Sequence, residues 1–458
     1  MIARAPFGAL MATFLLLATP LAAFEIERVV SPGGIEAWLV EERTVPVIVM
    51  EVAWEGGTAT DTAEKAGTAN MAASLLGEGA GDLPSQAFQA RLDDIAAQLS
   101  FSVDNDYLNA SLKTLAEARD EAFALFALAI AEPRFDDDVV ERIRAQIGVA
   151  VARNRQSPDW LAADAWYRAA LGSHPYALNG QGTPETLPRI LRDDLTGYTK
   201  NVLARDNMKI AVVGPISAEE LGALLDLTFG VLPAEAVLPD IPTVEVAKGA
   251  QTVVVERDFP QSVVIFGSQG MARDDPDFIP AFMMNYILGG GSFSSRLMTE
   301  VREKRGLAYS VGTSLSPLKR AAMMFGQVAT RNERVGQSLA IIRGELRRMA
   351  EEGVSAEELA DAKTYLTGSY PLRFTSNSSI ANQLIGIQTE NLGIDYVKRR
   401  NGLIEEVTQD DIARVAARLL RADDLVVAIV GRPNLSPTVE NLPETGDMAP
   451  SAAPDRQH

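Results

Sequence analysis

The chain has 458 residues, enough for two large domains, and its 47% hydrophobic and 22% charged residues are ordinary for a soluble globular protein. It contains no cysteine, which excludes disulfides, thiolate catalysis and cysteine-ligated metal centres. Its two histidines are His174 and His458, so one copy cannot build a site from two or three clustered imidazoles. The formal charge of −19 argues against a nucleic-acid partner, which would require clustered Lys and Arg.

The N-terminal segment has the pattern of an export signal. Arg4 precedes an apolar run from Phe7 to Ala18, and Pro20-Leu21-Ala22-Ala23 then supplies a helix breaker and small residues. We therefore expect residues 1–23 to be a signal peptide and the protein to be periplasmic or secreted. The run is short for a membrane span, and we expect no span after signal removal, with a retained N-terminal anchor as the alternative.

Residues 24–236 are predicted to form the first domain, in which strand and helix patterns alternate. The predicted strands are Glu25–Val30, Ile35–Val40, Val45–Trp54, Leu99–Val103 and Tyr107–Leu112. The predicted helices are Lys65–Leu76, Ser85–Gln98, Leu115–Ala131 and Asp136–Gln156. A proline-containing stretch then predicts a linker at residues 237–249.

Residues 250–434 are predicted to form the second domain, and residues 435–458 a disordered tail. The predicted strands here are Thr252–Arg257 and Ser262–Ser268, and the predicted helices are Asp277–Leu288, Val335–Glu352, Ser355–Tyr370 and Ser378–Glu390.

An internal repeat relates the two domains. A helix that begins at Asp193 leads through an acidic turn to the strand Met208–Val213 and a glycine. The same order, a helix from Asp410, an acidic turn, the strand Leu425–Val430 and a glycine, recurs 217 positions later without a gap. Two domains of one fold follow from this repeat.

Four stretches, in order along the chain, carry a resemblance to a known family. They are Gly56-Gly57 through Leu83-Pro84-Ser85; His174-Pro175-Tyr176 with Gly182-Thr183-Pro184-Glu185; Leu288-Gly289-Gly290-Gly291-Ser292; and Val301-Arg302-Glu303-Lys304-Arg305-Gly306-Leu307-Ala308-Tyr309-Ser310-Val311. Together they resemble the pitrilysin/insulinase family of zinc peptidases, in the short bacterial two-domain form related to the mitochondrial processing peptidase.

The resemblance implies an α+β fold of two homologous domains, each a mixed, largely antiparallel sheet with helices on one face. Two such domains form half of a clamshell, and a second chain supplies the other half. In active members, a His-x-x-Glu-His motif on the first domain's helix provides two zinc ligands and the glutamate that activates water. A glutamate from a later helix completes the zinc site.

The motif positions are degenerate in this chain. Asn70 and Ser74 occupy the two histidine positions and Ala73 occupies the position of the general base, while no carboxylate occurs near Val149 or Ala150, where the later ligand is expected. Asparagine and serine are poor zinc donors, and a methyl group cannot accept a proton. We therefore expect no metal and no cofactor in this chain, with zinc held by a homologous partner subunit.

Arg302 and Tyr309 match an Arg/Tyr pair that the family's active assemblies deliver to the scissile peptide from the second half of the clamshell. The pattern predicts an amphipathic helix over Ser294–Lys304, a left-handed cap at Gly306 and a strand over Leu307–Thr313 with Tyr309 on the same face as Leu307 and Val311. The alternative is a surface salt bridge for Arg302 and a core position for Tyr309.

Other candidates concern peptide binding. Gly289, Gly290 and Gly291 lack the Lys-Ser/Thr ending of a phosphate loop and are predicted to let a substrate backbone pass closely. By family analogy, the strand containing Leu99, Ser100 and Phe101 is predicted to accept an extended peptide at its edge. A lone histidine is more often structural than catalytic, and this is our interpretation of His174.

These observations predict a non-catalytic partner subunit of a heterodimeric zinc metalloendopeptidase, with peptides as substrates. The alternative is a structural or peptide-binding homodimer without a proteolytic role.

Overall fold

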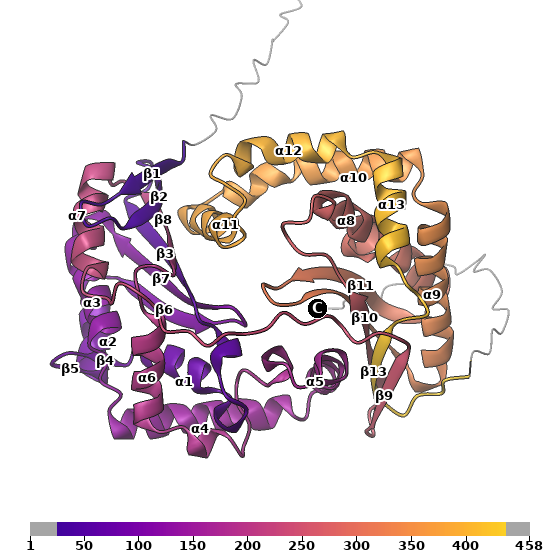
Figure 1. The fold of residues 1–458 in the computed structure, drawn as a ribbon, viewed down its shortest axis with the longest axis horizontal. Helices are drawn as coiled ribbons and strands as arrows, with labels where there is room; N and C mark the ends of the chain where they lie inside the picture. The colour runs from indigo at the N-terminus through magenta and orange to yellow at the C-terminus, as the bar shows by residue number, and fades with distance from the viewer. Residues whose placement is uncertain (1–24, 437–458) are drawn as a thin grey trace, which may run out of the picture.

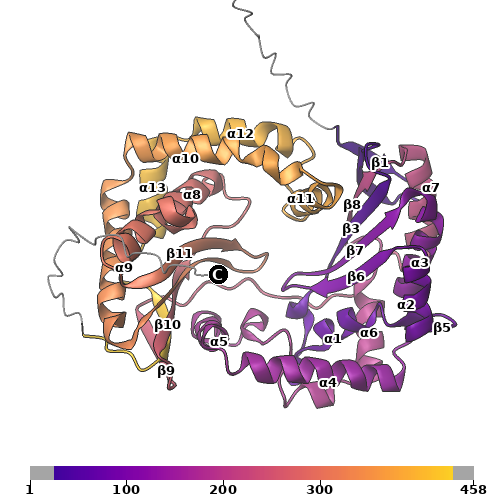
Figure 2. The same ribbon diagram turned by 180° about the vertical axis from the view of Figure 1, so that it is seen from behind.

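The computed structural model describes residues 25–436, which form two sheets with helices packed on them (Figure 1). The predicted signal peptide and most of the predicted tail lie outside these residues. The two domains lie on opposite sides of the molecule, and the same arrangement is visible from behind (Figure 2). The expected α+β class with two sheet-containing domains is confirmed.

The N-terminal sheet has six strands in the order β1-β2-β8-β3-β7-β6. Only the β2–β8 pairing is parallel, and the other pairs are antiparallel. The strands are β1 (Glu27–Val30), β2 (Glu36–Glu41), β3 (Val47–Glu55), β6 (Gln98–Val103), β7 (Tyr107–Leu115) and β8 (Met208–Gly214), and a separate two-stranded ribbon contains β4 (Gly79–Ala80) and β5 (Leu83–Pro84).

Seven helices lie between these strands or follow them. They are α1 (Thr68–Leu75), α2 (Ser85–Asp94), α3 (Arg119–Ala131), α4 (Asp137–Asn154), α5 (Pro158–Leu171), α6 (Arg192–Val202) and α7 (Ala218–Phe229). All except α5 bury side chains against one face of the sheet, in a core whose largest members include Trp54, Phe88, Phe123 and Phe126.

The C-terminal sheet has five strands in the order β11-β12-β10-β13-β9. The strands are β9 (Gln251–Glu256), β10 (Gln261–Gln269), β11 (Ala308–Pro317), β12 (Ala322–Arg331) and β13 (Val426–Gly431). The helices are α8 (Phe278–Asn285), α9 (Val335–Glu352), α10 (Ala356–Gly368), α11 (Asn377–Thr389), α12 (Tyr396–Glu406) and α13 (Gln409–Leu419). No helix or strand lies between Phe229 and Gln251, the region of the predicted linker.

The repeat read from the sequence is present in three dimensions. Helix α6 leads into β8 as α13 leads into β13, and each strand ends at a glycine with positive φ, Gly214 (153°) and Gly431 (147°). In each sheet this strand has a parallel neighbour on one side and an antiparallel strand on the other. By this equivalence β6 corresponds to β11, and each is the last strand of its sheet.

Each sheet also carries a helix from the opposite domain, which the expectation of helices on one face omitted. Helix α11 places Ile380 and Leu384 on the inner face of the N-terminal sheet, against residues such as Trp38 and Val213. Helix α5 lies beside the C-terminal sheet (Figure 1), and its Trp166 packs on the inner face of that sheet. The two domains therefore exchange helices, because each inner face is apolar and packs against a helix of the other domain.

Strand ends of the two sheets also meet in a polar cluster. The Lys319 ammonium lies 2.6 Å from the Glu55 carboxylate, and the Lys319 amide donates to Asp106 over 3.1 Å. Tyr176 donates its hydroxyl proton to Asp106 and accepts from the amide of Arg320.

Across residues 25–436, no helix combines the length and the apolar character that a membrane crossing requires.

Candidate functional site

Helix α1 carries the degenerate motif. Asn70 is half-buried, Ala73 is buried, and the Ser74 hydroxyl is turned back onto the helix, donating to the Asn70 carbonyl over 2.8 Å. Helix α4 packs beside α1, but Val149 on it is 71% exposed and no carboxylate stands there. Within the described part of the chain, no group of three His, Cys, Asp or Glu side chains could hold a metal ion. The residues present do not fit zinc.

Asp61 fixes the N-terminus of α1. Its two carboxylate oxygens accept from the amides of Gly67 and Ala69 at 2.8 and 3.0 Å. Burial raises the pKa of Asp61 to about 7, in opposition to these hydrogen bonds. The N-terminus of α1 is thus held by a buried carboxyl group, although the motif positions on the helix carry no zinc ligands.

Arg302 and Tyr309 lie together, as the sequence predicted for the pair. The Arg302 guanidinium lies 4.8 Å from the centroid of the Tyr309 ring and 4.7 Å from that of Phe293. We call these three residues the aromatic–arginine stack. Each contact is a cation–π interaction. Neither ring is part of the core, since Tyr309 is 81% and Phe293 62% exposed.

The two alternatives for this pair are not observed. No carboxylate among residues 25–436 forms an ion pair with Arg302, and the nearby Glu300 instead binds Lys304 and Arg305. Tyr309 is exposed rather than packed in the core.

The prediction that Tyr309 shares a face with Leu307 and Val311 is wrong. Leu307 and Val311 are buried, whereas Tyr309 is exposed. The pairing of β11 with β12 shifts between Ala308 and Val311, so that two residues of β11 oppose one of β12. This β-bulge interrupts the alternation of buried and exposed side chains along β11 and turns the Tyr309 ring towards Arg302.

The segment that carries Arg302 departs from the predicted α-helix over Ser294–Lys304. It begins with a 3-10 turn at Ser292–Ser294 and continues as a π-helical stretch at Met298–Glu303. Leu297, Met298 and Val301 are buried as predicted. Gly306 has φ of +57° and ends the segment in the expected left-handed conformation.

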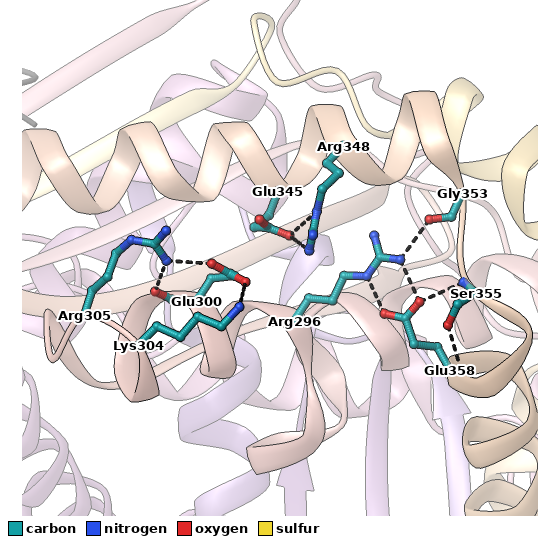
Figure 3. A network of polar contacts seen from close by, with 9 residues as sticks. All are labelled: Arg296, Glu300, Lys304, Arg305, Glu345, Arg348, Gly353, Ser355 and Glu358. Atoms are coloured by element: carbon teal, nitrogen blue, oxygen red, sulfur yellow. Dashed lines mark hydrogen bonds and ion pairs between the residues drawn. The ribbon is translucent and has the colours of Figure 1, made fainter. Parts of the chain in front are cut away.

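Charged residues anchor this segment to α9 and α10 (Figure 3). Arg296 binds both carboxylate oxygens of Glu358 at 2.6 and 2.8 Å and donates to the Gly353 carbonyl. At the other end, Glu300 accepts from Lys304 and Arg305 at 2.8 and 2.6 Å. The hydrogen bonds from Arg296 hold the pKa of Glu358 down at about 2. Arg302 is therefore presented from a fixed support.

The three glycines form a turn against β11. Gly289 and Gly290 end a π-helical stretch, Tyr286–Gly290, and the Gly291 amide donates to the Tyr286 carbonyl over 2.8 Å. A Cβ at Gly289 would lie 2.7 Å from the Thr313 amide nitrogen. Gly289 therefore lacks a side chain because the chain's own strand β11 passes close to it. Contact with a substrate backbone stays a prediction.

Strand β6 is an edge strand, as peptide addition requires. Leu99 and Phe101 pack towards the N-terminal core, while Ser100 lies on the opposite face and is exposed. The outer edge of β6 has no strand beside it among the described residues, and α1 lies close to the strand. Peptide binding by these three residues stays a prediction.

His174 has a structural environment. Its Nδ1 accepts from the Tyr176 amide, which leaves Nε2 to donate to the Pro242 carbonyl at 2.8 Å. The ring is buried and joins the first domain to the linker.

Phe293 was missed in the sequence. It stands between Ser292 and Ser294 in a Gly/Ser-rich turn just before the Arg302 segment, and an aromatic residue in such a turn was the available signal. Ser292, which precedes it, has φ of +52°, an uncommon conformation for a residue with a side chain.

The fold of two related α+β domains and the exposed Arg302–Tyr309 pair are those expected from the resemblance to zinc peptidases, although α1 carries no zinc ligand. The profile described as "Insulinase (Peptidase family M16)" matches residues 39–179, and that described as "Peptidase M16 inactive domain" matches residues 189–366. The chain belongs to the peptidase M16 family, and it is a member without a zinc site of its own in the described residues.

Some relatives of this chain are named as non-peptidases and others as zinc proteases. A Helicobacter pylori protein called "Non-peptidase homolog YmxG" is 26% identical over 391 residues, covering 85% of this chain and 90% of its own length. A Bacillus subtilis protein called "Uncharacterized zinc protease YmxG" is 24% identical over 408 residues, with 88% and 98% covered.

The fold of this chain is similar to that of several solved structures. A Pseudomonas fluorescens structure described as a peptidase M16 inactive domain has a TM-score of 0.83 at 28% identity and covers 92% of this chain and 100% of its own. A chain of Complex III2 from Candida albicans has a TM-score of 0.75 at 14% identity, with 89% and 96% covered, and shows likeness of fold alone.

Proposed function

We propose that this protein is the non-catalytic subunit of a heterodimeric zinc metalloendopeptidase, acting in the periplasm or outside the cell. The carrying observation is the aromatic–arginine stack, in which an unpaired guanidinium and a phenol are held together on an exposed, anchored segment. The partner would be a homologous subunit that holds zinc and the water-activating glutamate. The match to an inactive-domain profile and the name of the Helicobacter relative support a non-catalytic role.

The pair suits the stabilisation of a peptide oxyanion. Arginine offers several N–H donors with a permanent charge, and tyrosine offers a neutral O–H donor at working pH. Donors of this kind contribute roughly 10²–10³-fold each in rate when they are aimed at a developing negative charge. Stacking on two rings limits the rotation of the guanidinium, so its donors are oriented before a substrate arrives.

The test combines the purified chain with a homologous subunit that carries His-x-x-Glu-His. We expect the two to co-elute in size-exclusion chromatography and to cleave peptides together, while neither does so alone. Arg302→Ala and Tyr309→Phe should each lower kcat by roughly 10²–10³-fold without changing co-elution.

Tyr365→Phe is a matched control, because Tyr365 is also an exposed tyrosine of the C-terminal domain, on α10, and its ring stacks on Tyr286 rather than on Arg302. Full activity of the Arg302 and Tyr309 variants would contradict the proposal. Co-elution without any peptide cleavage, or a stable homodimer that ignores the zinc subunit, would favour the structural or peptide-binding role.

A further inference from the structure

A cavity of about 850 Å³ lies beside the aromatic–arginine stack. It follows β11 from Tyr309 to Leu315 and extends past the outer edge of that strand to α8 and the glycine turn. We call it the β11 pocket. Its volume is in the range of pockets that hold a large side chain together with part of a main chain.

One part of the wall of the β11 pocket is apolar, and the rest is polar and includes Asp159 and Gln327. The apolar part includes Phe278, Met298 and Val311, which are at most 8% exposed and so belong to the rigid core. Phe282 and Phe325 are half-buried and complete this surface. The binding free energy at such an apolar surface is most favourable when a bulky hydrocarbon side chain covers it and displaces its water.

Phe293 stands at the mouth of the pocket. One face of its ring contacts Arg302, yet the side chain stays 62% exposed on a turn where Ser292 has a left-handed backbone. Such strain is uncommon for serine and tends to occur at binding sites. A large aromatic side chain held outside the core in this way is available for a ligand.

The pocket also contains unsatisfied polar groups. Asn285 Oδ1 and Thr313 Oγ1 are buried and have no hydrogen-bond partner among the described residues, and both residues line the pocket. Asn285 and Thr313 are only 7% and 5% exposed. Buried polar atoms without a protein partner are rare in folded proteins, and these two oxygens can form hydrogen bonds with a ligand that enters the pocket.

These features together select one class of ligand. An unpaired guanidinium at the mouth, polar groups in the wall and an outer edge of β11 without a neighbouring strand suit a polar main chain. The apolar part of the wall suits a bulky side chain. We propose that the β11 pocket binds an extended peptide and takes up one large apolar side chain, such as Phe or Leu, beside Phe293.

This site goes beyond the proposed function, because every group in it belongs to this chain and no zinc partner is needed. On this proposal, the non-catalytic subunit itself selects peptides that carry a large apolar side chain. Phe293 is then a specificity-determining residue.

The probe is a fluorescein-labelled, capped peptide of Gly, Ser and Thr with one central residue, made in Phe, Leu, Ala and Asp versions. Binding to the full chain is followed by fluorescence anisotropy without any zinc subunit. We expect the Phe and Leu peptides to bind roughly 10- to 100-fold more tightly than the Ala peptide, in line with the burial of one large side chain.

Two variants test the location. Phe293→Ala should weaken the Phe peptide about tenfold while leaving the Ala peptide unchanged, because only a buried large side chain contacts the ring. Ser314→Trp, at an exposed position that lines the pocket, should fill it and remove the preference. Leu372→Ala is the control, since Leu372 is 70% exposed in the same domain but outside the pocket.

Equal affinities across the peptide series, or no saturable binding, would overturn the inference. A preference that survives both Phe293→Ala and Ser314→Trp would do the same. Neither result bears on the proposed function, which is tested by peptide cleavage with the zinc subunit and the Arg302 and Tyr309 variants. Failure of the pocket and failure of the proposed function are therefore distinguishable.

Discussion

Trp166, on a helix of the N-terminal domain, donates its indole N–H to the Val426 carbonyl in the C-terminal sheet over 3.0 Å. The Trp166 side chain is 1% exposed. The contact joins residues 260 positions apart and satisfies a polar group that would be costly to bury alone. It is one part of the helix exchange, in which each domain completes the hydrophobic packing of the other.

The exchange predicts that the two domains unfold together. Leu384→Ala on α11 removes a side chain that is fully buried against the N-terminal sheet, so we expect a loss of about 2–5 kcal/mol in the free energy of unfolding. Far-UV circular dichroism and tryptophan fluorescence should follow one common urea transition for wild type and variant. Leu372→Ala, at an exposed position, should change stability by less than about 0.5 kcal/mol. Two separated transitions would contradict the prediction.

The anchor of the Arg302 segment predicts a pH effect. Because Arg296 lowers the pKa of Glu358 from 4.5 to about 2, the pair stabilises the fold above pH 4.5, and this contribution is lost as the pH falls towards 2. Glu358→Gln should cost about 1–3 kcal/mol near neutral pH, with part of the effect screened because Glu358 is partly exposed. The difference between wild type and variant should shrink in urea titrations at pH 3. A constant difference, or an equal effect of the exposed neighbour Glu357→Gln, would contradict this.

Asp61 predicts an effect of opposite sign. Burial raises its pKa from 3.8 to about 7, so its contribution to stability is fully present below pH 3.8 and is lost as the pH rises through about 7. The advantage of wild type over Asp61→Asn should therefore be larger at pH 5 than at pH 8, by an amount on the order of 1 kcal/mol per pH unit within this range. Chemical denaturation of both proteins at the two pH values measures it. A larger advantage at pH 8 would show that the amide hydrogen bonds dominate and that the carboxylate stays ionised.

The degenerate motif predicts what is needed to regain metal binding. Asn70 and Ser74 lie four residues apart on α1, so Asn70→His with Ser74→His places two imidazoles on one helix face. We expect the double variant to retain zinc after dialysis and the wild type to retain none, measured by atomic emission. Each single variant should behave as the wild type, since one imidazole is a weak site. Stoichiometric zinc in the wild type, with unaided peptide hydrolysis, would overturn the assignment of this chain as non-catalytic.

Much of the fold could be predicted because its signals are local. Predicted strands such as Tyr107–Leu112 and helices such as Val335–Glu352 lie within a few residues of those observed, and the repeat identified two related domains. The closeness of the segments that carry Arg302 and Tyr309 also followed from local order, a helical segment, a glycine cap and a strand, but the orientation of the Tyr309 ring did not.

The remainder depends on long-range pairing. The β-bulge that exposes Tyr309 arises from the register between β11 and β12, and no feature of Leu307–Val311 alone encodes it. The exchanged helices were missed because α11 looks like any amphipathic helix until its partner sheet is known. Phe293 had a local signal in its Gly/Ser-rich turn, whereas the unpaired side-chain oxygens of Asn285 and Thr313 depend on how two separate segments pack together.

The exchanged helices have a mechanical consequence. With Trp166 buried under one sheet and Leu384 under the other, bending the chain between its domains would expose both apolar faces to water at once. The molecule should therefore move as a single rigid body. We therefore do not expect a hinge between the two domains of this chain to admit or release a large ligand.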